Sequence, residues 1–236
     1  MNDLLERFKN HKYFQRIFNI SDDIIIIFLS GSRISGIVDE YSDYDICVFT
    51  PHFQMKDCFQ RIQANTGEII HWYYNSIETI SGSSFIKEDK NFGLMLVYFL
   101  EQEHILYLNP TYKNWINCIL KNKIEIARHQ AMIFYKYMLP TIYTFINYEF
   151  IPTNMYKKNI YQLCLTYYIL LNKPIETEFL KRIKRIRYQE VQNSDVLKAY
   201  NMILELHNYC QSLNYNYKME SERLYNMLLE ALPGDE

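Results

Sequence analysis

Glycine and proline are scarce in this chain, with six of each among 236 residues. Because glycine supplies the positive φ angles that tight turns need, this scarcity disfavours an architecture of many short strands joined by turns. Tyrosine and phenylalanine are abundant instead, with 22 and 14 residues, and 49% of the chain is hydrophobic. The composition therefore predicts long helices around a sizeable core, in one large domain or two small ones.

Cysteine motifs and long apolar runs are missing as well. The five cysteines are widely scattered without a Cys-x-x-Cys pair, and an odd number does not complete a disulfide framework. Free, buried thiols in a reducing compartment are the expected state. No apolar run has the ~18 residues of a membrane span, and the N-terminal segment reads as an amphipathic helix, not a signal peptide. We therefore expect a cytoplasmic protein without a membrane partner.

Charge is unevenly distributed along the chain. The net charge of −2 points by itself to neither a nucleic acid nor a membrane. Residues 1–110 carry 9 basic and 15 acidic side chains, a balance of −6, whereas residues 111–236 carry 16 and 12, a balance of +4. An acidic first part is expected of a domain that binds divalent cations.

One short segment carries most of the chemical information. The apolar run 24–29 leads into a turn, and a second apolar run begins at Ile46. Between them lie Gly31-Ser32-Arg33-Ile34-Ser35-Gly36 and then Ser42-Asp43-Tyr44-Asp45. Residues i and i+2 of a strand share a face, so Asp43 and Asp45 are expected side by side, where their carboxylates repel unless a cation lies between them. Such oxygen ligands hold Mg²⁺ beside nucleotide phosphates, and the Gly-Ser turn offers backbone N–H groups and a hydroxyl to a phosphate.

This pattern resembles the nucleotidyltransferases of the DNA polymerase beta superfamily, whose signature is hydrophobic-Gly-Ser, about ten residues, and Asp-hydrophobic-Asp or Glu. Small and aminoglycoside nucleotidyltransferases of that superfamily often read Gly-Ser-Arg-x-x-Gly and then Ser-Asp-x-Asp, as residues 24–50 do here. The resemblance implies an α+β fold. A mixed sheet with flanking helices would form a catalytic domain over residues 1–112, and an all-α helical bundle would follow over residues 113–236.

The resemblance also implies an activity and a set of ligands. The enzyme would move a nucleoside monophosphate from an NTP, with ATP the expected donor, to a hydroxyl acceptor and release pyrophosphate. One or two Mg²⁺ ions would be bound by the catalytic residues Asp43 and Asp45. The nucleotide would be bound by Gly31, Ser32, Arg33 and Ser42. An ion pair between Arg33 and a nearby surface acid is an equally good interpretation of that arginine.

The family's third acid is harder to place. It usually lies on the next strand, where it binds metal or acts as the general base for the incoming hydroxyl. Here that strand reads Glu68-Ile69-Ile70-His71-Trp72-Tyr73-Tyr74. We assign the third catalytic position to Glu68, the only acid of this strand, with His71 as the alternative; an exposed charge at the start of the strand is an equally good interpretation of Glu68. An imidazole would be a base near neutral pH but a poorer Mg²⁺ ligand than a carboxylate.

The pattern of apolar residues predicts the remaining elements. Strands are expected over 24–29, 43–50, 68–74 and 104–108, and helices over 3–18, 54–64, 92–101, 116–137, 155–172, 176–188, 194–212 and 217–232, with a short helix beginning at 32–35. Pro140 is expected to kink or end the long helix that precedes it. The change from strands to helices at residues 109–114 marks the predicted domain boundary.

Three questions stay open at the level of sequence. The run Lys181-Arg182-Ile183-Lys184-Arg185-Ile186-Arg187 is either a solvated helix face or a patch for the phosphates of tRNA or another nucleic acid. The acceptor is either a small molecule such as an antibiotic, or a tRNA or protein, and the basic second part counts against a cationic aminoglycoside. In a different class, the chain would be a nucleotide- or partner-binding module that kept the fold and lost turnover.

Overall fold

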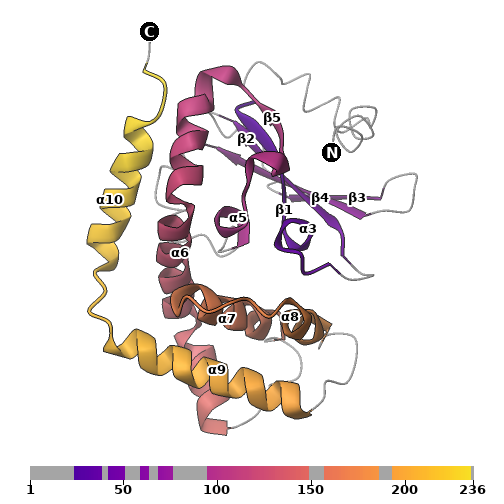
Figure 1. The fold of residues 1–236 in the computed structure, drawn as a ribbon, viewed down its shortest axis with the longest axis vertical. Helices are drawn as coiled ribbons and strands as arrows, with labels where there is room; N and C mark the ends of the chain where they lie inside the picture. The colour runs from indigo at the N-terminus through magenta and orange to yellow at the C-terminus, as the bar shows by residue number, and fades with distance from the viewer. Residues whose placement is uncertain are drawn as a thin grey trace.

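The computed structural model describes residues 24–38, 42–50, 59–63, 69–76, 95–148, 157–185 and 193–234. Within these ranges a five-stranded sheet is followed in the chain by helices (Figure 1). The α+β class predicted from the sequence is therefore confirmed. The predicted helix over 3–18, Glu68 and Cys58 lie outside the described residues.

The sheet is mixed and has the spatial order β3-β4-β2-β1-β5. Its strands are β1 (Ile26–Ser30), β2 (Tyr44–Thr50), β3 (Phe59–Gln63), β4 (Ile69–Ser76) and β5 (Ile105–Leu108). The pair β2 and β4 is parallel, and all other pairs are antiparallel. Four of the five residues of β1 are buried, so both of its faces are covered, which explains why its sequence is a continuous apolar run and not an alternating one.

One of the predicted helices is wrong where the structure describes it, and another is confirmed only in part. Residues 59–63, expected within a helix over 54–64, form β3 and pair antiparallel with β4 from Phe59 opposite Tyr73 to Gln63 opposite Ile69. Backbone pairing with a strand distant in sequence has overridden the local helical pattern. Of the helix expected over 92–101, the described part starts at residue 95: Met95–Tyr98 form α5, the helix does not continue to residue 101, and a 3₁₀ turn follows at Gln102–His104.

From residue 113 onward the described elements are helices only, as predicted. They are α6 (Lys113–Tyr148), α7 (Lys157–Leu170), α8 (Thr177–Lys184), α9 (Asn193–Ser212) and α10 (Tyr217–Glu230). The expectation that Pro140 could end its helix is wrong, because α6 continues through it. Met138 and Ile142 are both buried, so packing holds the helix together on either side of the proline. No helix in the described ranges combines the length and the apolarity that crossing a bilayer requires.

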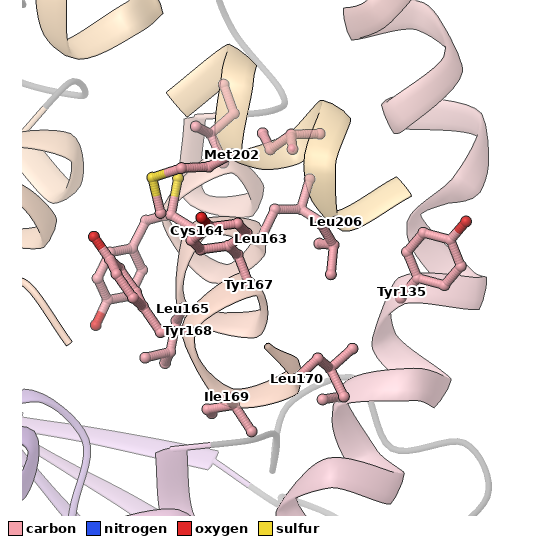
Figure 2. Close-up of a cluster of buried hydrophobic side chains, with 14 of the residues drawn as sticks. Tyr135, Leu163, Cys164, Leu165, Tyr167, Tyr168, Ile169, Leu170, Met202 and Leu206 are labelled. Carbon is pink, nitrogen blue, oxygen red and sulfur yellow. The ribbon is translucent and has the colours of Figure 1, made fainter. Parts of the chain in front are cut away.

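Two clusters of buried side chains hold the molecule together. In the first, Leu163 and Leu170 of α7 pack with Tyr135 of α6 and Leu206 of α9 (Figure 2). Ile37, which comes from the segment after β1, also belongs to this helical cluster and is fully buried. The second cluster joins the sheet to α6 and to α10, which lies beside α6 on the side away from the sheet (Figure 1). The helices and the sheet therefore share buried surface.

Candidate functional site

The glycine–serine turn follows β1 directly and depends on its first glycine. Gly31 has φ 69° and ψ −147°, a backbone conformation that is open essentially to glycine alone. The chain then forms α3 (Ser32–Ser35), the one-turn helix that the sequence predicts, and Gly36 ends it with φ 70° and ψ 6°. The amide of Ser35 donates to the carbonyl of Gly31, and the Ser35 hydroxyl donates to the carbonyl of Ser32 at 3.2 Å. The turn is therefore a compact unit at the end of a buried strand.

The carboxylate of Asp45 lies against this turn. In the antiparallel pair of β1 and β2, Asp45 is opposite Ser30, whose hydroxyl donates to the Asp45 main-chain carbonyl at 3.1 Å. A Cβ atom added to Gly31 would lie 2.0 Å from Oδ2 of Asp45, so the carboxylate fills the space that a side chain would need. Only glycine permits this approach, and the acid and the turn thus belong to one site.

The loop that leads into β2 is held by Arg33. Asp43 directly precedes β2, and the guanidinium of Arg33 donates to the main-chain carbonyl of Ser42 at 3.0 Å and to that of Asp43 at 3.4 Å. The same guanidinium lies 4.0 Å from the centre of the Tyr44 ring, a cation–π contact. Asp43 and Asp45 are both partly exposed. The structure therefore brings together all six predicted site residues of the motif, Gly31, Ser32, Arg33, Ser42, Asp43 and Asp45.

A lysine from the helical part reaches the same loop. Lys184, the last residue of α8, donates from Nζ to the hydroxyl of Ser42 at 3.1 Å. The sequence places these two residues 142 positions apart, so no local pattern could pair them. The one signal was the cationic run that contains Lys184, which we interpreted as a solvated face or a nucleic-acid patch.

The other cations of that run that have assigned contacts pair with acids of the chain. Lys181 forms an ion pair with Glu178 at 2.6 Å within α8. Arg182 donates two hydrogen bonds to the carboxylate of Asp195 on α9, at 2.8 and 3.1 Å, and Asp195 is buried. Lys181 thus pairs within its own helix, whereas Arg182 joins α8 to α9, a contact that neither interpretation of the run describes.

For the predicted third position, the structure gives strand register alone. In the parallel pair of β2 and β4, Asp45 is in register with His71. Residues in register on neighbouring strands occupy equivalent positions of the sheet, so His71 lies at the backbone position next to Asp45. Among the described residues, no group of three or more His, Cys, Asp or Glu side chains is arranged to hold a metal ion. The assignment of Glu68 stays a prediction.

A neutral, buried thiol follows the site on β2. Cys47 is two residues after Asp45, is buried, and has its Sγ 3.4 Å from the Ser30 hydroxyl. Burial raises the pKa of the Cys47 thiol far above its ordinary value; the hydrogen bond to Ser30 acts in the opposite direction, and the charge of Asp45 adds a smaller rise. Cys47 is therefore a neutral packing residue, and the four described cysteines are all free, as expected.

No model of a known protein family matches the chain, and no curated protein matches its sequence significantly. The function of the chain is therefore inferred from its motif and from the geometry of the site.

Proposed function

We propose that the chain is a Mg²⁺-dependent nucleotidyltransferase of the DNA polymerase beta type. The observation that carries the proposal is the contact between the Asp45 carboxylate and the Gly31 turn. An acid that could bind a cation and a turn that could bind phosphate lie together there, as a magnesium–nucleotide complex requires. The mixed sheet and the following helices are compatible with the fold that the motif implies.

The residues of the site suit the chemistry of nucleotidyl transfer. Asp43 and Asp45 would hold one or two Mg²⁺ ions through carboxylate oxygens, as hard oxygen ligands do. When bound, Mg²⁺ would neutralise the negative charge that develops on the phosphate oxygens. The main-chain N–H groups of the turn and the hydroxyl of Ser32 would orient the phosphates of the nucleotide. The protein's own contribution is therefore mainly alignment.

The transfer itself exchanges one bond to phosphorus for another. The acceptor hydroxyl oxygen forms a bond to the α-phosphorus of the NTP, the bond from that phosphorus to the α–β bridging oxygen breaks, and pyrophosphate leaves. The hydroxyl proton passes to a general base, for which Glu68 is our assignment from sequence. The register of β2 and β4 supports His71 as the alternative, since it lies next to Asp45.

The helical part would contribute to acceptor selection. It approaches the site through α8, whose Lys184 contacts Ser42 in the loop before β2. The acceptor would be a hydroxyl compound such as an antibiotic, or a tRNA or protein. The net positive charge of residues 111–236 favours an acceptor that is not polycationic.

The proposal is tested by replacing each acid without changing its shape. Asp43→Asn and Asp45→Asn should each abolish transfer of label from α-labelled ATP to acceptors in a panel of aminoglycosides, tRNA and proteins. Glu230→Gln, at the exposed end of α10, removes one charge at a distance and should leave the transfer unchanged. Undiminished transfer by both aspartate variants would refute the proposal.

A second function is favoured by the register of His71. If an imidazole occupies the third position, the metal site is weaker than one with three carboxylates, and the chain would bind nucleotide or a partner without turnover. Such a module would be stabilised against thermal unfolding by ATP with Mg²⁺ and release no pyrophosphate with any acceptor. Stabilisation together with pyrophosphate release would favour the enzyme.

A further inference from the structure

The loop that carries Asp43 is held by cations from two different parts of the chain. Arg33 of α3 binds the main-chain carbonyls of Ser42 and Asp43, and Lys184 of α8 binds the hydroxyl of Ser42. The backbone of Ser42 is thus hydrogen-bonded to the part of the chain that forms the sheet, and its side chain is hydrogen-bonded to the helical part. We infer that Arg33 and Lys184 are positioning residues that set the geometry of Asp43, and that Lys184 transmits the position of the helical part to the metal site. This inference rests on the proposed function.

Arg33 is well placed for this role because its guanidinium is a planar fork. Two of its N–H groups point to adjacent carbonyls, and its face lies on the Tyr44 ring at 4.0 Å. Its own backbone is fixed, since it lies in the single turn of α3 between Gly31 and Gly36. The guanidinium of Arg33 therefore orients the peptide groups on either side of Asp43. The motif alone would suggest instead that it binds a phosphate.

Lys184 belongs to a helix that is packed firmly into the helical core. The buried face of α8 consists of Phe179, Leu180 and Ile183, all in the helical core. The paired hydrogen bonds of Arg182 to Asp195 tie α8 to α9. A movement of these helices would therefore carry the ammonium group of Lys184 with them, and with it the hydroxyl of Ser42.

The connection from α3 to β2 contacts the helical part at a second point, nearer to α3. Ile37, one residue after the glycine that ends α3, is fully buried in the helical cluster. The connection from α3 to β2 is thus fixed to the helical part at Ile37 and at Ser42. An acceptor that shifts α8 would change the position of Asp43, which would couple acceptor binding to metal binding.

The test is a double-mutant cycle with Mn²⁺ as the probe. Free Mn²⁺ is followed by electron paramagnetic resonance while it is titrated into full-length protein with saturating ATP. Ser42→Ala removes the hydroxyl that Lys184 contacts, and Lys184→Met removes the ammonium group but keeps an apolar stem. Each should weaken Mn²⁺ binding roughly 3- to 10-fold, the scale of one lost hydrogen bond. The double variant should bind Mn²⁺ about as tightly as the single variant with the lower affinity, because both substitutions remove the same contact.

Arg33→Lys gives an independent test of the arginine. Lysine keeps the charge but cannot bind two carbonyls through a fork, so Mn²⁺ binding should again weaken, while the affinity for metal-free ATP should stay within twofold. Arg128→Gln, on the exposed face of α6, is the matched control and should bind Mn²⁺ as the wild type does. Lys184→Arg, which restores a donor, should recover at least part of the loss caused by Lys184→Met.

Each contrary result has a distinct meaning. Additive effects of Ser42→Ala and Lys184→Met would show that Lys184 acts on the nucleotide directly and would overturn the inference for it. Unchanged Mn²⁺ binding with weaker ATP binding in Arg33→Lys would make that arginine a phosphate ligand and overturn the inference for it. Absence of ATP-dependent Mn²⁺ binding in the wild type would refute the proposed function itself, and the inference with it. Thermal unfolding of each variant shows whether a loss of Mn²⁺ binding comes from misfolding. If Lys184→Met is misfolded, Mn²⁺ binding by Lys184→Arg decides whether Lys184 has the inferred role.

Discussion

Gly31→Ala is the most discriminating substitution that the structure suggests, because two separate costs meet at this position. The backbone conformation, with φ 69° and ψ −147°, costs a residue with a Cβ atom about 1–3 kcal/mol. The new Cβ would also lie 2.0 Å from Oδ2 of Asp45, and ordinary contact begins near ~3.5 Å. The carboxylate therefore has to move by about 1.5 Å, a displacement on the scale that costs roughly 100-fold in activity.

Gly36→Ala separates these two costs. Gly36 also has a positive φ, of 70°, but a Cβ atom there meets nothing within 4 Å. Its substitution should lower the free energy of unfolding by about 1 kcal/mol, through backbone strain alone. In a chain of this length each kcal/mol lowers Tm by about 2–4 °C. We expect Gly36→Ala to lower Tm by about 2–4 °C and Gly31→Ala by about 4–10 °C.

The two variants should differ most in ligand binding. Thermal unfolding is followed by circular dichroism, with and without ATP and Mg²⁺. Gly36→Ala should keep the stabilisation by ligand, and Gly31→Ala should lose it because Asp45 is displaced. Equal losses of Tm in the two variants, with ligand stabilisation retained in both, would refute the argument that Gly31 makes room for the acid.

Two further predictions concern titratable groups. Hydrogen bonds from Lys173 and Tyr167 hold the pKa of Glu205 below its ordinary value of 4.5, so the unfolded chain binds the proton more readily at this site. The stability that this carboxylate contributes is present above pH 4.5 and is lost as the pH falls through the lowered pKa. Denaturant titrations of Glu205→Gln should therefore show a weaker loss of stability on acidification than the wild type. Among the thiols, burial raises the pKa of Cys210 to about 12, whereas Cys118 is partly exposed, so peptide mapping after brief alkylation near pH 8 should find Cys118 labelled before Cys210.

The local part of the site could be predicted from the sequence because its geometry is encoded within a few residues. A buried strand, a glycine with positive φ and a one-turn helix at 32–35 follow from the order of apolar residues and glycines, and the structure has all three. The bounds of α7 and α9 lie within two residues of those predicted, since their apolar residues recur at helical spacing.

The errors arise where distant segments meet. Residues 59–63 have a pattern that suits a helix, but pairing with β4 makes them a strand. The contact of Lys184 with Ser42 depends on where α8 packs, which no motif specifies. The register of β2 and β4 is also beyond sequence reasoning, and it places His71, the alternative to Glu68 that the sequence offers, at the backbone position next to Asp45.

The buried position of Ile37 has a consequence for anyone who separates the two parts of this chain. A fragment that stops after the sheet would lack the helical side chains around this isoleucine and would expose it to water. A helical bundle expressed alone would have a cavity at the place of its side chain. Grafting the helices onto another catalytic sheet would then require a large aliphatic residue at the matching point. Exchange of sheet and helical parts between proteins would therefore depend on this one side chain as well as on the surfaces around it.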